Sequence, residues 1–290
     1  MIPYARMEAV VTREGQQWVL VTGASTGIGR ATTEFLAGHG FGVYAGARKR
    51  EDLAALGSMQ QVVPVQLDVQ RAADVQTALD TVTAAGTGLF AVVNNAGIAR
   101  AGPLMDVPVE DMIEQFDVNV FGVHRVTRTF LPLVIASRGR IVMVSSDSGF
   151  FATPFFGPYC SSKFALEGYA DSLRREMSLL GVKVVIVEPG RVATPIWNKG
   201  EALLIRGLAS PLAPLARKVG RHAVQSGRRK GLCPVEVARV IHEILVTRQP
   251  KGRHIVAREK LEYRLYRILP ARVVDVLVAR ELRRIDQEGE

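Results

Sequence analysis

The sequence has little of what marks a disulfide-rich, metal-binding or membrane-spanning protein. Its 290 residues include only two cysteines, too few for a disulfide framework and typical of a reducing cytosol. The five histidines are scattered and form no cluster with metal-ligand spacing, so we expect no metal site. No apolar run reaches the roughly 18 residues that a membrane-spanning helix needs. Met1–Gln17 lacks the continuous apolar segment of a signal peptide, so we expect a cytoplasmic protein.

Most of the chain also lacks a net positive charge. Residues 1–200 hold 18 basic and 18 acidic side chains, whereas residues 201–290 hold 19 and 10, so the C-terminal part carries the whole net charge of +9. Such a segment is compatible with nucleic acid, with an anionic membrane surface or with ordinary solvated helices. No zinc-finger spacing or RNA-binding aromatic motif accompanies the charge, so we expect no nucleic-acid partner.

What the sequence does contain is a regular alternation of short apolar runs with helical patterns. The apolar runs are rich in β-branched residues without strict alternation, which is typical of strands buried in a parallel sheet. We expect strands at 18–22, 42–45, 61–67, 89–93, 139–145, 182–187 and 254–257. Helical patterns lie at 30–38, 51–57, 72–85, 109–136, 159–180 and 234–247. The sequence therefore predicts an α/β fold, a doubly wound, Rossmann-type parallel sheet with helices on both faces.

One domain accounts for this pattern, because no linker or internal repeat divides the chain. We expect an N-terminal extension at 1–16, a dinucleotide-binding catalytic domain at 17–258 and a C-terminal helical extension at 259–290. Within the domain, a variable segment at 196–232 is predicted to lie over the substrate site. Most of it, 200–231, is rich in proline, glycine and arginine and shows less regular periodicity.

A glycine-rich turn follows the first predicted strand. Gly23, Gly27 and Gly29 form the pattern G-x-x-x-G-x-G between a strand and a helix. Without side chains they let the backbone approach a pyrophosphate, whose negative charge the N-terminus of the helix stabilises. In this setting the motif predicts a dinucleotide site rather than a simple turn.

The end of the second predicted strand indicates which dinucleotide is bound. A site that prefers NAD usually places an acid there to hold the ribose 2′-hydroxyl, but here Ala47 is followed by Arg48. An arginine can bind a 2′-phosphate bidentately, so we expect NADP(H) to be preferred over NAD(H). The alternative is that Arg48-Lys49-Arg50 is only a solvated turn.

Tyr159 and Lys163 are four residues apart and would lie one turn apart on one face of a helix. There the ammonium would lower the pKa of the phenol from about 10 toward neutrality, so that the phenol exchanges protons at working pH. This spacing alone is weak support. Four phenylalanines before Tyr159 suggest an apolar pocket, although packing in the core or on a partner subunit explains them equally well. They are Phe150, Phe151, Phe155 and Phe156.

Taken together, the motifs resemble those of the short-chain dehydrogenase/reductase family. The resemblance covers about residues 17–257. It rests on Thr22–Gly29, Asn94–Gly97, Asn119, Ser146, Tyr159 with Lys163, and Pro189-Gly190 with Thr194. Within the family, the stretches 139–146 and 159–168 are similar to the 17β-hydroxysteroid and retinol dehydrogenase branch.

The resemblance implies a catalytic set of Asn119, Ser146, Tyr159 and Lys163. Tyr159 would be the general acid in reduction and the general base in oxidation, and Lys163 would lower its pKa and hold the nicotinamide ribose. Ser146 would hydrogen-bond the substrate carbonyl, although the neighbouring Ser145 offers the same group. Asn119 would hold a water that links Lys163 to solvent.

The resemblance also implies the cofactor contacts. Asp68 and Val69 would contact the adenine, Asn95 to Gly97 would line its ribose, and Thr194 would bind the carboxamide. The predicted cofactor-binding residues are Gly23, Ser25, Thr26, Gly27, Ile28, Gly29, Arg48, Asp68, Val69, Asn95, Ala96, Gly97, Tyr159, Lys163, Pro189, Gly190 and Thr194. His124 and Cys160 have no family role, and we expect them to be packing residues.

We therefore expect an NADP(H)-dependent oxidoreductase that interconverts carbonyl and alcohol on a hydrophobic substrate. Steroids, retinoids and long-chain aldehydes or ketones are candidates. One alternative is a regulatory protein that senses NADP(H) without turnover.

Another alternative is a membrane-associated protein that uses its basic tail, where apolar and arginine residues recur at helical spacing on both sides of Pro270. This tail has two other interpretations: it is a packed extension of the core, or it is a lid over the substrate pocket. Members of the family typically pair through two long helices, here 109–136 and 159–180, so we expect a homodimer or homotetramer.

Overall fold

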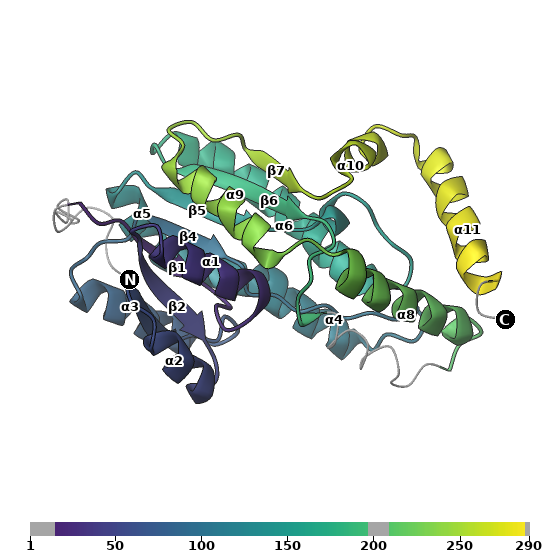
Figure 1. The fold of residues 1–290 in the computed structure, drawn as a ribbon, viewed down its shortest axis with the longest axis horizontal. Coiled ribbons are helices and arrows are strands. Elements are labelled where there is room, and N and C mark those ends of the chain that lie inside the picture. Colours follow the sequence, from purple (N-terminus) through teal and green to yellow (C-terminus); the bar gives the residue numbers. More distant parts are fainter. Residues whose placement is uncertain (1–14, 197–208, 288–290) are drawn as a thin grey trace.

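The protein is built around a parallel sheet of seven strands, seen in a computed structural model that describes residues 15–196 and 209–287 (Figure 1). The strands are β1 (Trp18–Val21), β2 (Gly42–Ala47), β3 (Val62–Gln66), β4 (Ala91–Asn94), β5 (Arg140–Val144), β6 (Lys183–Pro189) and β7 (Arg253–Val256). Their order is β3-β2-β1-β4-β5-β6-β7, and every neighbouring pair is parallel. The order reverses between β1 and β4, and in such sheets ligands bind at the carboxyl ends of the strands beside this reversal.

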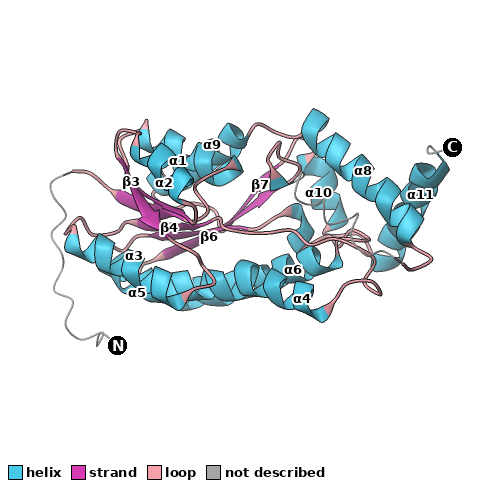
Figure 2. Ribbon diagram, turned by 90° about the horizontal axis from the view of Figure 1, so that it is seen from below, coloured by secondary structure: helices cyan, strands magenta, loops and turns pink. Residues whose placement is uncertain are grey.

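Helices cover both faces of the sheet (Figure 2). One face carries α1 (Gly27–Ala37), α2 (Arg50–Gly57) and α9 (Pro234–Val246), and the other carries α3 (Ala72–Ala84), α5 (Val123–Ala136) and α6 (Gly157–Ser178). Every residue of β2 and β5 is buried, because the apolar side chains on both sides of each strand meet a helical layer. The predicted Rossmann-type fold is confirmed.

The prediction of one continuous helix at 109–136 is wrong in one respect. It is divided into α4 (Val109–Phe116), a π-helical segment η2 (Asp117–Gly122) and α5. Apolar periodicity runs through all three parts, so the sequence pattern does not reveal the extra residue per turn. Short π segments inside α-helices occur frequently at functional sites, and this one contains Asn119.

The segment 200–231, whose sequence shows less regular periodicity, is helical over most of its described part. Helix α8 (Ala213–Lys230) begins with Pro214 in its first turn, where a proline is tolerated. Its buried positions are small, with Ala213, Ala216 and Val219 among them. Small residues at helical spacing give a weak apolar signal, which the surrounding basic residues obscure. Residues 197–208 lie outside the described part of the chain.

The C-terminal extension forms two helices, α10 (Lys260–Tyr266) and α11 (Ala271–Gln287), separated at Pro270 as predicted. They lie at one end of the molecule, and α11 packs on α8 (Figure 1). Among the helices of the described residues, none is both long and apolar enough to cross a lipid bilayer.

Candidate active site

The glycine-rich turn between β1 and α1 has a shape that only glycine permits. Gly23 has φ +64° and Gly27 has φ +56°, both in the left-handed region. A Cβ on Gly23 would lie 2.9 Å from the Cα of Ala96, and one on Gly29 would lie 2.2 Å from the carbonyl oxygen of Gly23. The turn is therefore packed tightly against the segment that follows β4.

Two polar side chains fix this turn to the end of β4. The Thr22 hydroxyl accepts hydrogen bonds from the backbone N–H groups of Asn95 and Ala96, both at 3.0 Å. The Asn95 side chain donates to the carbonyl oxygens of Thr22 at 2.9 Å and Gly23 at 3.2 Å. Asn95 thus shapes the turn itself, which adds a structural role to the ribose contact predicted for it.

The N-terminus of α1 fits a pyrophosphate. No side chain caps it at Thr26, and its first turn, which begins with Gly27 and Ile28, contains no acidic residue. Its backbone N–H groups are thus available to an anion that the helix dipole also favours. Ser25 precedes this turn and is half-buried.

The segment after β6 lies opposite the glycine-rich turn. The Gly190 N–H donates to the carbonyl oxygen of Val256 at 3.0 Å, which holds the Pro189-Gly190 corner against β7. Thr194 approaches Gly27 so closely that a Cβ on this glycine would lie 3.1 Å from Thr194 Cγ2. The structure therefore brings the predicted phosphate-binding and carboxamide-binding segments together.

Arg48 and Asp68 meet at the carboxyl ends of β2 and β3. Arg48 Nη1 lies 4.0 Å from Asp68 Oδ2, and the Arg48 side chain is 56% exposed. This separation leaves the guanidinium free to bind a phosphate. The Val69 side chain is buried in the core beside Gly122. Any adenine contact from Val69 would have to come from its backbone.

Tyr159 and Ser146 come together between β5 and α6. Ser146 follows β5, and its hydroxyl lies close enough to Tyr159, in the first turn of α6, to lower the pKa of the phenol. Ser145 is buried, and its hydroxyl lacks a hydrogen-bond partner among the described residues. Of the two candidate serines, Ser146 is therefore the one that contacts Tyr159.

The ionisation of Tyr159 differs from the expectation. Burial raises the pKa of Tyr159 above its usual value, and the negative charge of Asp147 raises it further, while the hydrogen bond with Ser146 lowers it. Lys163 does not counter the burial here, because its Nζ lies 5.6 Å from the centroid of the Tyr159 ring and donates to the carbonyl oxygen of Val144 at 2.9 Å. The phenol is therefore protonated at neutral pH.

Lys163 is itself buried, one helical turn after Tyr159. Burial lowers the pKa of Lys163 to about 8, against a smaller raising effect of the Glu167 charge. At neutral pH the ammonium still predominates. Lys163 can thus present a positive charge to a ribose hydroxyl and to an ionised phenol.

Asn119 joins the strand end to the tyrosine helix. Its side-chain oxygen accepts from the Ile98 N–H at 2.9 Å, and its amide donates to the Ile98 carbonyl and to Ser162 Oγ, both at 3.1 Å. Gly97 lies beside it, since a Cβ there would be 3.4 Å from the Asn119 oxygen. Asn119 therefore contacts the residue next to Lys163 rather than Lys163 itself, and the water relay stays a prediction.

Two of the four phenylalanines pack against the C-terminal extension. Phe150 contacts Tyr263 with ring centroids 6.2 Å apart, and Phe151 contacts Tyr266 at 4.6 Å. These two side chains thus pack within the chain, against the tail rather than in the core. Sequence analysis missed this contact because nothing in the pattern of the tail specifies which loop it meets.

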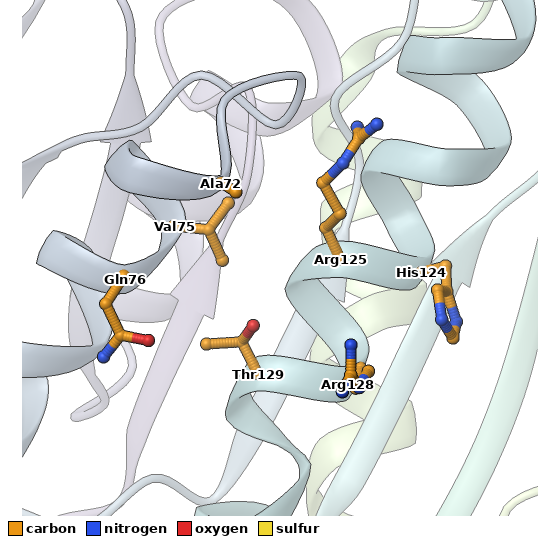
Figure 3. A pocket seen from close by; sticks show the side chains of 7 residues that line it. All are labelled: Ala72, Val75, Gln76, His124, Arg125, Arg128 and Thr129. Atoms are coloured by element: carbon orange, nitrogen blue, oxygen red, sulfur yellow. The ribbon is translucent and has the colours of Figure 1, made fainter. Parts of the chain in front are cut away.

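A small pocket of about 190 Å³ lies between α3 and α5, away from these residues (Figure 3). It is lined by Ala72, Val75, Gln76, His124, Arg125, Arg128 and Thr129. The charge of Arg125 is compensated, because its Nη2 lies 2.6 Å from Asp117 Oδ1. We assign this pocket no part in the reaction, since none of the predicted site residues lines it.

The fold and the site define a class of protein. A doubly wound sheet, a glycine-rich turn at a free helix N-terminus and a half-buried tyrosine with a buried lysine one turn away are the parts of a nicotinamide-dependent oxidoreductase. The sequence profile described as short chain dehydrogenase matches residues 17–202, and the chain belongs to this family. It is accordingly an NAD(P)-dependent oxidoreductase.

Two relatives are similar over nearly the whole chain. An NADPH-dependent 3-dehydrocapnine reductase of Ornithobacterium rhinotracheale is 33% identical, over 94% of this chain and 100% of its own length. The uncharacterized oxidoreductase YbbO of Escherichia coli (strain K12) is 34% identical, over 91% and 94%. The crystal structure of a short-chain dehydrogenase from Streptomyces avermitilis superimposes with a TM-score of 0.75 at 26% identity, covering 96% of this chain and all of that one.

Proposed function

We propose that the protein is an NADP(H)-dependent reductase that interconverts a carbonyl and an alcohol on a hydrophobic substrate. The observation that carries the proposal is the placement of Ser146 beside Tyr159, one helical turn before the buried Lys163. When bound, the nicotinamide supplies the hydride. Tyr159 donates the proton to the carbonyl oxygen, Ser146 stabilises the charge that develops there, and Lys163 binds the ribose and stabilises the phenolate.

The preference for NADP(H) rests on Arg48. Its guanidinium is exposed at the end of β2, where an acid would repel a 2′-phosphate, and Ala47 offers no acid. The relative from Ornithobacterium, similar over its whole length, is named as NADPH-dependent. We infer that Arg48 binds the 2′-phosphate with a charge-assisted hydrogen bond of about 1.5–3 kcal/mol.

The experiment is cofactor oxidation across a panel of apolar ketones and aldehydes, with NADPH and NADH compared at each substrate. NADPH should be preferred, and Arg48→Ala should erode that preference by weakening NADPH alone. Arg50→Ala is a matched control, because Arg50 lies exposed in the same basic run but at the start of α2. Equal use of both cofactors by the wild-type protein would contradict the preference.

The substrate, the assembly and the cellular site are proposals of the same kind. We propose a steroid, a retinoid or a long-chain aldehyde or ketone as substrate, a homodimer or homotetramer as assembly, and a cytoplasmic protein that contacts membranes peripherally through residues 259–290. Exposed apolar side chains on α4, α6, α10 and α11 support the assembly and the membrane contact.

A further inference from the structure

Gln115, in the last turn of α4, has a fully buried side chain that joins two parts of the active site. Its oxygen accepts from the backbone N–H of Arg100 at 2.7 Å, and its nitrogen donates to the carbonyl oxygen of Ile98 at 2.8 Å. The same nitrogen lies 3.4 Å from Ser162 Oγ, which is a longer and weaker hydrogen bond. The side chain thus connects the segment that follows β4 with helix α6.

Asn119 makes the same connections four residues later. Its nitrogen donates to the carbonyl oxygen of Ile98 and to Ser162 Oγ, both at 3.1 Å, and its oxygen accepts from the Ile98 N–H at 2.9 Å. The π-helical segment η2 begins between the two side chains, yet both amides meet the same two oxygens. We call Gln115 and Asn119 the amide pair.

The hydroxyl of Ser162 has the hydrogen-bonding capacity that the amide pair requires. It donates its hydrogen to the carbonyl oxygen of Tyr159 at 2.8 Å, so that both of its lone pairs are left to accept from the two amides. Ser162 is 0% exposed, and no water competes for these bonds. Removing one member leaves buried polar groups of the others without a partner, which costs free energy.

The two parts that the amide pair joins have different tasks in the proposed reaction. The segment 98–100 directly follows Asn95–Gly97, which is predicted to line the cofactor, whereas Ser162 lies in α6 between Tyr159 and Lys163. The amide pair therefore sets the distance between the cofactor and the groups that act on it. Rates depend steeply on such distances, since a misplacement of about 1 Å can lower a rate by about 10²-fold.

Ion pairs hold the same segment on its outer side. The Arg100 guanidinium bonds the carboxylate of Glu114 and lies 3.7 Å from that of Asp111, both in α4 and both partly exposed. These pairs hold the segment to α4, whereas the amide pair holds it to α6.

We propose that Gln115 is a positioning residue of the active site. Together with Asn119 it holds Ser162, and with it the first two turns of α6, at a fixed distance from the bound cofactor. Those turns carry Tyr159 and Lys163. Gln115 acts through these groups, so its loss should lower the rate of reaction while cofactor binding persists. This inference rests on the proposed function.

The test uses Gln115→Met, which removes the amide and keeps nearly the same volume. The kcat of carbonyl reduction, expressed per folded molecule, should fall by about tenfold or more, because Tyr159 is no longer held in place. The Kd for NADPH should stay within a few fold, since the glycine-rich turn and Arg48 are untouched. Circular dichroism gives the folded fraction. Ser162→Ala should have the same effect, and it serves as the test if Gln115→Met does not fold.

Ser137→Ala is the matched control. The Ser137 hydroxyl, after the end of α5, donates to the carbonyl oxygen of Leu89 at 2.9 Å, before β4 and away from the site. Its loss should lower stability and leave kcat per folded molecule unchanged. Unchanged kcat in folded Gln115→Met or Ser162→Ala, or an equal fall in the control, would overturn the proposal.

A double variant tests whether Gln115 acts through Ser162. In the Ser162→Ala background, Gln115→Met should lower kcat by a smaller factor than in the wild type, because the shared acceptor is already gone. Strictly multiplicative effects would overturn the proposed route.

The failure of the proposed function is distinguishable, since wild-type turnover that Tyr159→Phe abolishes tests it separately. Hydrogen exchange needs no turnover at all. In Gln115→Met, peptides that cover 98–100 should exchange faster relative to those of β1, because the Arg100 N–H has lost its acceptor. Unchanged exchange there would overturn the positioning role.

Discussion

Tyr159 is the residue on which the proposed reaction depends, because it alone among the site residues is placed to donate a proton beside Ser146. Tyr159→Phe removes the donor and almost no volume, so turnover should be abolished while the affinity for NADPH stays within a few fold. Steady-state kinetics measure the turnover, and titration of NADPH fluorescence measures the affinity. A variant that kept more than about a tenth of the wild-type rate would place the general acid elsewhere, since such a group typically contributes about 10²–10⁴-fold.

Lys163 gives the cofactor-free protein a characteristic dependence of stability on pH. Its pKa is lowered from 10.5 to about 8 by burial, so between these values the unfolded chain binds more protons than the folded one. The free energy of unfolding should therefore rise with pH, by about 2 kcal/mol between pH 8 and pH 10. Above pH 10 the trend reverses, because the raised pKa of Tyr159 lets the unfolded phenol ionise first.

Urea denaturation of wild-type protein and of Lys163→Met at several pH values measures this dependence. The variant has no titrating group at this position, so its stability should lack the rise. Parallel curves for the two proteins would show that Lys163 is not buried as an ammonium at neutral pH.

At the scale of elements, the sequence predicts those features that residues close together in the chain determine by themselves. The strands, the turn at Gly23 and the break at Pro270 follow from apolar runs, glycine and proline. The π-helical segment around Asn119 does not follow from the sequence, because the apolar periodicity continues in the helices before and after it. The contact of Tyr263 with Phe150 also escapes prediction, because it depends on the ion pair of Arg267 with the buried Glu188 of a distant strand.

The helices α4, η2 and α6 present apolar side chains to solvent where they contact one another. Ile113, Phe121 and Phe164 are exposed there, Phe121 by 52%. Exposed aromatic residues in one area indicate a protein interface, and the family typically pairs through these helices.

Light scattering should therefore give the mass of a dimer or tetramer. The double variant Phe121→Glu with Phe164→Glu should have a lower mass, because assembly would bury its two carboxylates at the interface. Leu179→Glu is the control, because this leucine is 87% exposed just after the end of α6 and away from η2. A monomeric mass for the wild-type protein at micromolar concentration would contradict the assembly.

At the scale of the whole molecule, α8 and α11 lie together at one end (Figure 1). The excess of basic residues lies in 201–258, which hold 12 basic and 3 acidic side chains, whereas residues 259–290 hold seven of each. Leu261, Arg264 and Leu265 follow the spacing of one face of α10, and Ile268 continues it in the turn after the helix. The three apolar residues are exposed, Ile268 by 77%. The opposite face of the same helix carries Tyr263, which packs against the Phe150 ring. An amphipathic helix so placed can lie on an anionic membrane and bring an apolar substrate close to the site.

α11 is also amphipathic and is longer than α10. Its inner face packs on α8 through Ile285, whereas Val273, Val276, Leu277 and Arg280 lie together on the outer face. Each basic residue near an anionic surface contributes about 1 kcal/mol, and screening by salt removes it. We therefore expect membrane contact to involve both helices and to weaken as salt is added.

The full-length protein should float with vesicles of anionic lipid at low salt, and less so as salt is added. Leu261→Glu with Ile268→Glu should reduce flotation, because two carboxylates then face the acyl chains and the anionic headgroups. Val246→Glu, at the exposed end of α9, is the matched control and should float like the wild type. If the wild-type protein stays at the bottom of the gradient, or floats equally with uncharged lipid, the outer faces of α10 and α11 do not bind an anionic membrane.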